Sequence, residues 1–481
     1  MSVIVATCCT TLNAQSFEEY RKAYLEQHKQ YTQTITNNYN SYRDSLNQQF
    51  ADFMRNKWVE KSFQAPIPIP VEPKPAVPIV LQPEEEGPSE AVEDVVTSPD
   101  TPIIDVPFKG VETPIDSKPL IHIPPQQQAD FRFDYYGTEI SLPIGELHKF
   151  ELDGVDENSV ADAWLILSSD EYTQLLEQAM AIHSELQMSD WGYVRLVQKA
   201  TEAFLGKTDE AVVMQMYLLV NSGYMARMAR VDDHLILLLP SMAEIWQYSY
   251  ITIGDYKYYM IGDKPVGKCY LLEYAFPNER SISLEIGREQ LFEYEATDVR
   301  YLPFAGSYIG LTANRNLLDF YADYPLNNTL TVYATSPIYS MTKYQLYPVL
   351  RSAIDGLTQA EAANVLLNFV QTSFAYQTDQ EQFGREKPMF ADEMLFYPYC
   401  DCEDRSFFFA RLVNDLLGLD VVLLDYPGHI ATAVYFTEEV SGDYYLIDGR
   451  KYVVCDPTYI NAPVGRSMPN MQTAEIVRLD L

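Results

Sequence analysis

A proline-rich segment divides this chain more sharply than any other feature. Residues 65–129 hold fifteen of the 29 prolines, and eleven acidic residues there are opposed by three lysines. Proline removes a backbone donor and fixes φ, and unbalanced charge opposes collapse. The segment is therefore predicted to be an extended acidic linker without a stable fold, with an ordered region resuming near residue 130.

The first residues, MSVIVATCCTTLNAQS, are mostly apolar and too few to span a bilayer. A small residue, Ala14, stands where a signal peptidase would cut. Residues 1–15 are therefore predicted to be the end of an export signal, although no positive n-region precedes them. A lipid anchor on Cys8 is the alternative.

Residues 16–64 contain neither glycine nor proline. Aromatic side chains recur at intervals of seven, as at Phe17, Tyr24 and Tyr31, and this spacing is typical of one helix face. We expect one long helix, either in a coiled coil or resting on the main body.

The charge and motif content exclude several classes of function. The chain carries 68 acidic and 34 basic residues, a formal charge of −34, so nothing would neutralise the phosphates of a nucleic acid. No apolar run is long enough for a membrane span. No phosphate loop, glycine-rich nucleotide turn or calcium loop occurs, and we expect neither a cofactor nor a metal.

Three regions follow the linker. Residues 130–268 show helical periodicity and then strand-like runs, HLILLLP, QYSYITI and YKYYMI. Residues 269–345 contain the runs CYLLEYAF, SISLEI and LTVYAT, which predict a small β-rich domain. Residues 346–481 mix helices and strands, and the whole chain is expected to be of the α+β class.

Two cysteines stand one residue apart in YPYCDCEDRS, residues 397–406. Apolar residues at helical spacing follow Cys402 and stop at Gly418, and Asp401 is a suitable N-cap. Cys402 would then lie in the first turn of a helix. The free N–H groups and the positive end of the helix dipole favour a thiolate there and can stabilise an oxyanion.

A histidine and an aspartate complete the pattern. His429 begins a predicted strand and is the only histidine after His234. Asp448-Gly449 between apolar runs predicts a hairpin, whose second strand leads to Asp456. Adjacent antiparallel strands would bring His429 and Asp456 together, beside the helix that carries Cys402, as nucleophile, base and orienter.

Other roles for these cysteines remain open from the residues alone. Cys400, Cys402, His429 and Cys455 could form a Cys₃His zinc site, although Cys-x-Cys is tighter than the usual zinc spacing. Cys400 and Cys455 could instead form a disulfide in an exported protein, which would leave Cys402 as a thiol.

The motif set resembles the transglutaminase-like superfamily. In that family a cysteine opens a helix that ends in glycine, a histidine follows about ten residues later, and a strand ends in Asp-Pro-Thr. The matching residues here are Cys402-Glu403-Asp404, Gly418, His429 and Asp456-Pro457-Thr458. The likeness covers residues 346–481.

The resemblance implies a papain-like α+β core in which Cys402 is the nucleophile, His429 the base and Asp456 the orienting residue. Cys400 departs from the family, which commonly has glycine two positions before the nucleophile. Tyr376 is a candidate oxyanion donor, with a packed aromatic as the plainer interpretation.

A weaker copy of the pattern lies within residues 130–268. Lys207 opens a helix that ends at Gly223, His234 begins a strand, and Asp263 follows a hairpin, at spacings close to those around Cys402. This region is either a degenerate second copy, with lysine where the nucleophile would stand, or a chance recurrence of a common helix-and-strand order.

Together these features predict an exported cysteine-dependent acyl-transfer enzyme, periplasmic or at the cell surface, that hydrolyses a peptide or amide bond of a protein or peptide substrate. The alternative is a catalytically inactive scaffold or binding protein of the same fold.

Overall fold

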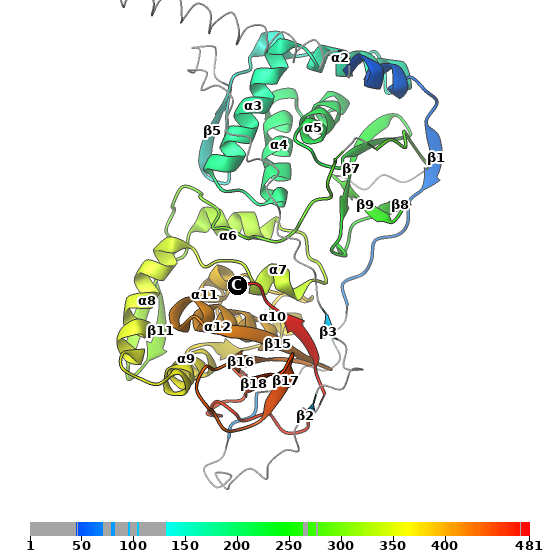
Figure 1. Cartoon of the computed structure of the whole chain (residues 1–481). Coiled ribbons are helices and arrows are strands. Elements are labelled where there is room, and N and C mark those ends of the chain that lie inside the picture. The colour runs from blue at the N-terminus through cyan, green and yellow to red at the C-terminus, as the bar shows by residue number, and fades with distance from the viewer. Residues whose placement is uncertain are drawn as a thin grey trace, which may run out of the picture.

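The computed structural model describes residue 45 and residues 47–70, 78–81, 95–96, 103–104, 131–262, 268–275, 278–471 and 473–481. These residues form an α+β protein with two lobes, one above the other in Figure 1. The predictions for residues 1–15 and for most of the helix at 16–64 lie outside the described residues.

The N-terminal lobe places helices against one face of an antiparallel sheet. Leu235, Leu237 and Leu239 alternate along β7 toward the helices, and Ile236 and Leu238 face the opposite side. Its elements are β1 (Val59–Ser62), β4 (Phe131–Tyr135), β5 (Thr138–Leu142), the 3₁₀ turn η2 (Glu146–His148), α2 (Glu157–Leu167), α3 (Asp170–Glu185), α4 (Asp190–Leu205), α5 (Asp209–Asn221), β6 (Arg227–Val231), β7 (His234–Ser241), β8 (Tyr250–Ile253), β9 (Tyr256–Ile261) and β10 (Lys268–Leu271).

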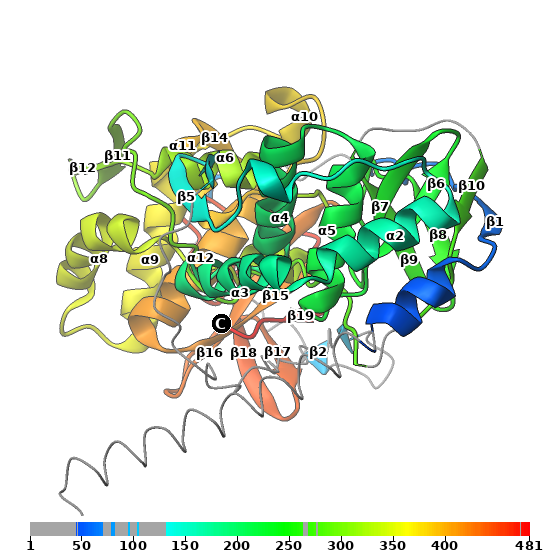
Figure 2. The same cartoon turned by 90° about the horizontal axis from the view of Figure 1, so that it is seen from above.

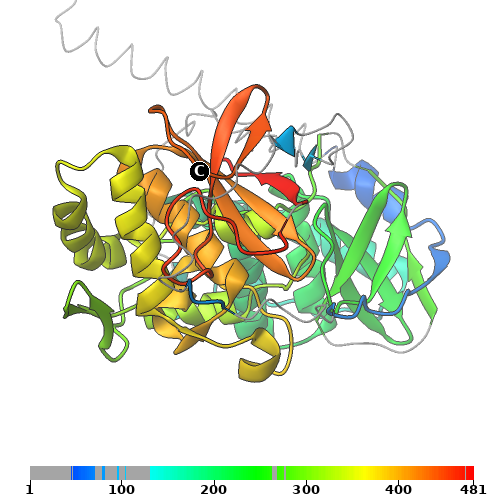
Figure 3. The same cartoon turned by 90° about the horizontal axis from the view of Figure 1, so that it is seen from below.

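The C-terminal lobe repeats this plan. Figure 3 shows its orange strands between the yellow helices and the green strands of the other lobe. Its elements are β11 (Arg300–Phe304), β12 (Ser307–Leu311), α8 (Ser340–Ile354), α9 (Gln359–Ser373), β13 (Ala375–Tyr376), α10 (Asp379–Gln382), α11 (Ala391–Phe396), β14 (Tyr399–Cys400), α12 (Cys402–Leu417), β15 (Asp420–Tyr426), β16 (His429–Tyr435), β17 (Tyr444–Ile447), β18 (Arg450–Cys455) and β19 (Glu475–Arg478).

The two sheets share one strand order. The first contains β10-β6-β7-β9-β8, and the second contains β19-β15-β16-β18-β17, with neighbouring strands antiparallel in both. In each lobe a helix, α5 or α12, directly precedes the first of these strands in the sequence and packs on the sheet. The correspondence agrees with the hypothesis of a second, degenerate copy.

The predicted β-rich domain at residues 269–345 is wrong. Among the described residues of this range, only the hairpin β11–β12 is a paired sheet of its own, and Figure 2 shows it projecting at one edge of the molecule. The run LTVYAT forms the helix α7 (Leu330–Ala334), which follows α6 (Arg315–Ala322). The β-branched residues of α7 favour a strand locally, but Tyr333 stacks on Phe407 of α12, and tertiary packing of this kind overrides propensity.

Some residues that were predicted to belong to the long helix or to the linker without a stable fold form strands instead. β1 pairs with β10, and the short strands β2 (Val95–Val96) and β3 (Ile103–Ile104) pair parallel with β17 and β19 at the two edges of the C-terminal sheet. Edge strands present unpaired N–H and C=O groups, and an extended segment can bind them wherever proline does not interrupt. The predicted helix that ends at residue 64 therefore includes a strand, and the predicted linker that ends at residue 129 includes two.

Within the part of the chain that the structure describes, no helix combines the length and the apolar character that crossing a membrane requires.

Candidate active site

Cys402 is the first residue of α12, as the sequence predicts. Asp401 is the N-cap, and its N–H donates to Oδ2 of Asp404 at 3.3 Å. Gly418 ends the helix with φ of 66°, a left-handed conformation that glycine adopts without strain. The Cys402 side chain is only 1% exposed, so its sulfur lies inside the protein.

His429 and Asp456 are in direct contact. Nε2 of His429 lies 2.9 Å from Oδ2 of Asp456, and the other oxygen, Oδ1, accepts the N–H groups of Thr458 at 2.9 Å and Tyr459 at 3.1 Å. The sheet explains the contact, because β16 and β18 are antiparallel neighbours with Thr432 opposite Cys455. His429 begins the first strand and Asp456 follows the second.

The helix brings Cys402 to the same end of the sheet. The hydroxyl of Ser406, one turn after Cys402 on the same helix face, donates to the carbonyl of Ile430 at 2.7 Å. Nδ1 of His429 is buried and makes no hydrogen bond with any described residue. The thiol of Cys402 lies 3.7 Å from Oε2 of Glu403, and its contact with Nδ1 stays a prediction.

Aromatic rings enclose the histidine and the thiol. The Tyr426 ring stacks on the His429 ring, with centroids 6.1 Å apart. Tyr376 pairs with Cys400 between β13 and β14. Burial, followed by the negative charges of Cys402 and Asp401, raises the pKa of the Tyr376 hydroxyl. Tyr376 therefore keeps its proton.

Arg405 joins three parts of the site. Its guanidinium is buried, donates to the carbonyls of Phe374 at 2.7 Å and Pro457 at 3.5 Å, and lies 5.3 Å from the centroid of the Tyr376 ring. Pro457 follows Asp456, so one side chain of α12 holds the loop of the orienting residue.

The alternative roles for the other cysteines find no support. Cys400 and Cys455 are not joined in a disulfide, and burial raises the pKa of Cys400 to about 12 and that of Cys455 still further. The four residues of the hypothetical zinc site do not converge as metal ligands among the described residues. Both thiols are therefore buried and favour the protonated form at neutral pH.

An acidic cluster beside the thiol escaped sequence reasoning. Asp379, Asp401 and Glu403 place carboxylate oxygens within 4.8 Å of one another, all buried. Burial and then the charge of Asp404 raise the pKa of Asp379 to about 9. Burial and then the charge of Asp401 raise the pKa of Glu403 strongly. Oxygen ligands of this kind suit a hard cation, and without a cation the same crowding of buried acids favours their protonated forms.

Gln371 of α9 was also missed. Its side-chain Nε2 donates to the carbonyls of Asp456 at 3.0 Å, Tyr459 at 2.8 Å and Ala462 at 3.0 Å. A buried amide clamps the loop after β18 and thereby positions Asp456. Its only sequence signal is a polar residue on the apolar face of a helix.

The N-terminal lobe carries a different pair at the corresponding place. Lys207 lies before the N-cap Thr208, so the predicted match of Lys207 with Cys402 is wrong. Asp209 is the first residue of α5, and its Oδ2 lies 3.6 Å from Nδ1 of His234, the first residue of β7. The matching distances from Lys207 to Gly223 and from Cys402 to Gly418 were misleading, because α5 has 13 residues and α12 has 16.

His234 is 80% exposed at its side chain, whereas His429 is buried. Asp263, the counterpart proposed for Asp456, lies outside the described residues. The N-terminal lobe thus presents an exposed histidine beside an aspartate where the C-terminal lobe has an enclosed thiol and imidazole.

Comparisons of this chain with family models, with curated proteins and with solved structures found no match.

The buried acids predict how stability depends on pH. In the unfolded chain Asp379 titrates near its usual pKa of about 3.9, and in the folded protein its pKa is about 9. The folded state therefore binds more protons, and the free energy of unfolding falls as pH rises from about 4 to 9, by at most about 1.4 kcal/mol per pH unit for one group.

Asp379→Asn should flatten this slope, measured by urea unfolding at pH 5, 7 and 9. Asp420→Asn, at an exposed ion pair with Arg450, is the control and should leave the slope unchanged. Equal slopes for wild type and Asp379→Asn would contradict the prediction.

A second prediction concerns the Gln371 clamp. Gln371→Leu leaves buried carbonyls without donors and should lower the free energy of unfolding by about 2–4 kcal/mol. Gln359→Leu on the same helix, where the amide meets Thr437 near the surface, should cost less than about 1 kcal/mol. Urea unfolding followed by circular dichroism measures both, and equal costs would rule out the clamp.

Proposed function

We propose that this protein is a cysteine-dependent acyl-transfer enzyme of the transglutaminase-like superfamily, with a papain-like core in its C-terminal lobe. The observation that carries the proposal is the contact between Nε2 of His429 and Asp456, which leaves Nδ1 of a buried imidazole available beside the helix that begins at Cys402. A nucleophile, a base and an orienter are recognised by this arrangement rather than by their order in the sequence.

The contact favours one tautomer of His429. If the Nε2–H group of His429 donates to Asp456, the lone pair of Nδ1 accepts the thiol proton of Cys402. The sulfur then attacks the carbonyl carbon of the substrate, and Nδ1 returns the proton to the departing amine. A thioester to Cys402 remains until water, deprotonated by the same nitrogen, hydrolyses it.

Developing negative charge on the carbonyl oxygen needs donors. The first N–H groups of α12 have no partner within the helix, and the Tyr376 hydroxyl, whose pKa is raised by burial and then by the charge of Cys402, keeps its proton. Peptide or amide hydrolysis is the preferred reaction, with a protein or peptide as substrate. Export, inferred from residues 1–15, belongs to the same proposal.

A scaffold or binding protein of the same fold is the second candidate. The burial of Cys402 and the contact of its thiol with Glu403 favour it, because a substrate would have to reach a sulfur that is only 1% exposed. Neighbouring carboxyl groups also oppose a negative sulfur.

Thiol labelling distinguishes the two. A thiol with the usual pKa of about 8.5 is roughly 0.3% ionised at pH 6 and reacts slowly with iodoacetamide. The enzyme proposal expects fast labelling of Cys402 at pH 6, lost in Cys402→Ala and retained in Cys400→Ala, the control for a buried thiol. His429→Ala should slow labelling at least tenfold, and Asp456→Ala should slow it less.

Peptide mass spectrometry of the labelled protein identifies the modified cysteine and gives each rate. Labelling that is slow at pH 6 in the native protein and rises only near pH 8–9 would contradict an activated thiolate. It would support the scaffold instead.

A further inference from the structure

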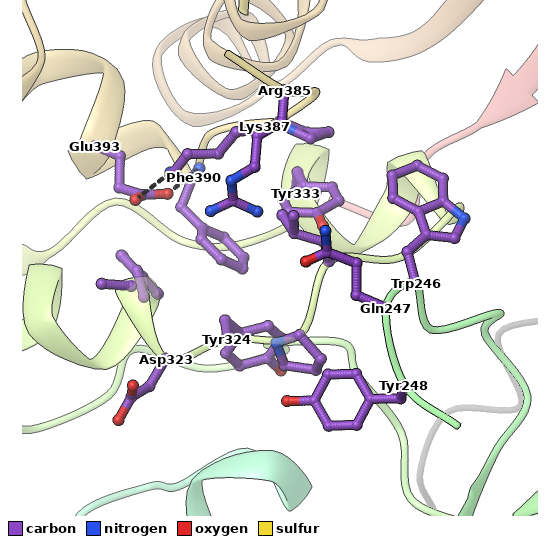
Figure 4. A pocket seen from close by; sticks show the side chains of 15 residues that line it. Trp246, Gln247, Tyr248, Asp323, Tyr324, Tyr333, Arg385, Lys387, Phe390 and Glu393 are labelled. Atoms are coloured by element: carbon purple, nitrogen blue, oxygen red, sulfur yellow. Dashed lines mark hydrogen bonds and ion pairs between the residues drawn. The ribbon is translucent and has the colours of Figure 1, made fainter. Parts of the chain in front are cut away.

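A pocket of about 210 Å³ opens where the two lobes meet. Three segments and Tyr333 of α7 line it: residues 246–248 of the N-terminal lobe, residues 321–326 at the end of α6 and beyond it, and a run between Arg385 and Glu393 in the C-terminal lobe. Figure 4 shows these side chains arranged around one space, with Trp246, Gln247 and Tyr248 on one side and Phe390 and Glu393 on another. The volume suits one amino-acid-sized group.

Most charges around the pocket are already paired. Asp323 lies 2.9 Å from Arg195 and accepts the Tyr136 hydroxyl at 2.8 Å. Glu393 lies 2.6 Å from Lys387 and accepts the N–H of Phe390 at 3.1 Å. Because of these contacts, the charges of Asp323, Glu393 and Lys387 are already balanced by neighbouring groups.

Arg385 is different. It forms no hydrogen bond or ion pair with any residue that the structure describes, although it belongs to a chain of net charge −34. Its side chain points from the wall toward the middle of the pocket (Figure 4). A guanidinium in this setting presents a planar set of donors that matches a carboxylate.

Aromatic residues form part of the rest of the wall, although polar atoms provide most of its accessible surface. Trp246, Tyr324 and Phe390 are buried, and the Tyr324 hydroxyl is occupied by the carbonyl of Leu284 at 2.7 Å. Gln247 adopts φ of 66°, a left-handed conformation that is costly for glutamine, and its backbone N–H donates to Ile67 at 2.8 Å. Strain of this kind is common at ligand sites, and here it presents a side-chain amide at the pocket.

We propose that this pocket binds a carboxylate attached to an aromatic or large aliphatic group, the chemistry of a peptide's C-terminal residue or of a small N-acylated amino acid. The carboxylate pairs with Arg385 and accepts from the Gln247 amide, and the apolar group packs among Trp246, Tyr324 and Phe390. Concave sites in which a few placed polar groups fix the orientation of a ligand are the usual form of small-ligand sites.

The wall that carries Arg385 also reaches the candidate active site. The N–H of Met389 donates to Oδ1 of Asp404 at 2.8 Å, and Glu386 shares a hydrogen bond with Glu403, the residue after Cys402. A ligand on Arg385 would therefore sit on the other side of the segment that flanks the thiol. Binding itself does not rest on the thiol chemistry and can be tested separately.

The experiment titrates the full chain with N-acetyl-L-phenylalanine and with its neutral amide by isothermal calorimetry, at pH 7 and 0.15 M salt. The acid should bind and the amide should bind at least tenfold more weakly. A peptide that ends in phenylalanine, tested with a free and an amidated end, distinguishes a peptide terminus from a free small acid as the source.

Three variants test the geometry. Arg385→Gln should weaken binding of the acid at least tenfold, and Ala322→Phe, which fills the pocket but keeps the charge, should do the same. Arg351→Gln, at an exposed arginine on α8 that likewise has no ion pair among the described residues, is the matched control and should bind as wild type does.

Circular dichroism confirms that each variant is folded. Absence of binding by both acids at millimolar concentration, equal binding of acid and amide, or unchanged binding in folded Arg385→Gln would each overturn the proposal. Loss of labelling at Cys402 would leave it standing, so the two proposals fail independently.

Discussion

A buried guanidinium supports the C-terminal lobe. Arg405 leaves water entirely, and a charge in that position is tolerated only when its surroundings compensate for lost hydration. The compensation comes from the carbonyls of Phe374 and Pro457 and from the face of the Tyr376 ring. These groups belong to the end of α9, to β13 and to the loop after β18, so the contacts of one side chain of α12 align the parts that the proposed chemistry needs.

The two lobes share a topology but differ in the surroundings of the histidine that begins one strand in each sheet. Both have a helix that starts beside the first residue of a sheet strand, and in both that residue is histidine. The C-terminal lobe buries its histidine against Asp456 beneath a tyrosine ring, whereas the N-terminal lobe exposes His234 to water next to Asp209. The framework recurs, and the enclosed, low-dielectric setting that would make a thiol and an imidazole useful occurs once among the described residues.

In their charged forms, the carboxyl groups around the thiol disfavour a thiolate at Cys402. The raised pKa values of Asp379 and Glu403 have the same first cause, the burial of each group. Protonated acids remove negative charge from beside Cys402 and can donate hydrogen bonds, so the cluster is compatible with a thiolate only while its protons are held. The electrostatic environment of Cys402 thus depends on carboxyl groups from both α10 and the start of α12.

The sequence by itself determined the local features of the site. Helical periodicity ended by Gly418, the Asp448-Gly449 turn with φ of 49° and 75°, and strand alternation placed Cys402 at a helix start and Asp456 next to His429. Each depends on residues a few positions apart, where capping and turn chemistry are readable. Only the tertiary structure decided that LTVYAT is helical, that parts of residues 59–129 pair with sheet edges, and that Gln371 clamps a loop about 85 residues away. It also decided that Arg385 faces a pocket and forms no ion pair with a residue that the structure describes. Those outcomes depend on which distant surfaces are buried together, and no local pattern of residues encodes that choice.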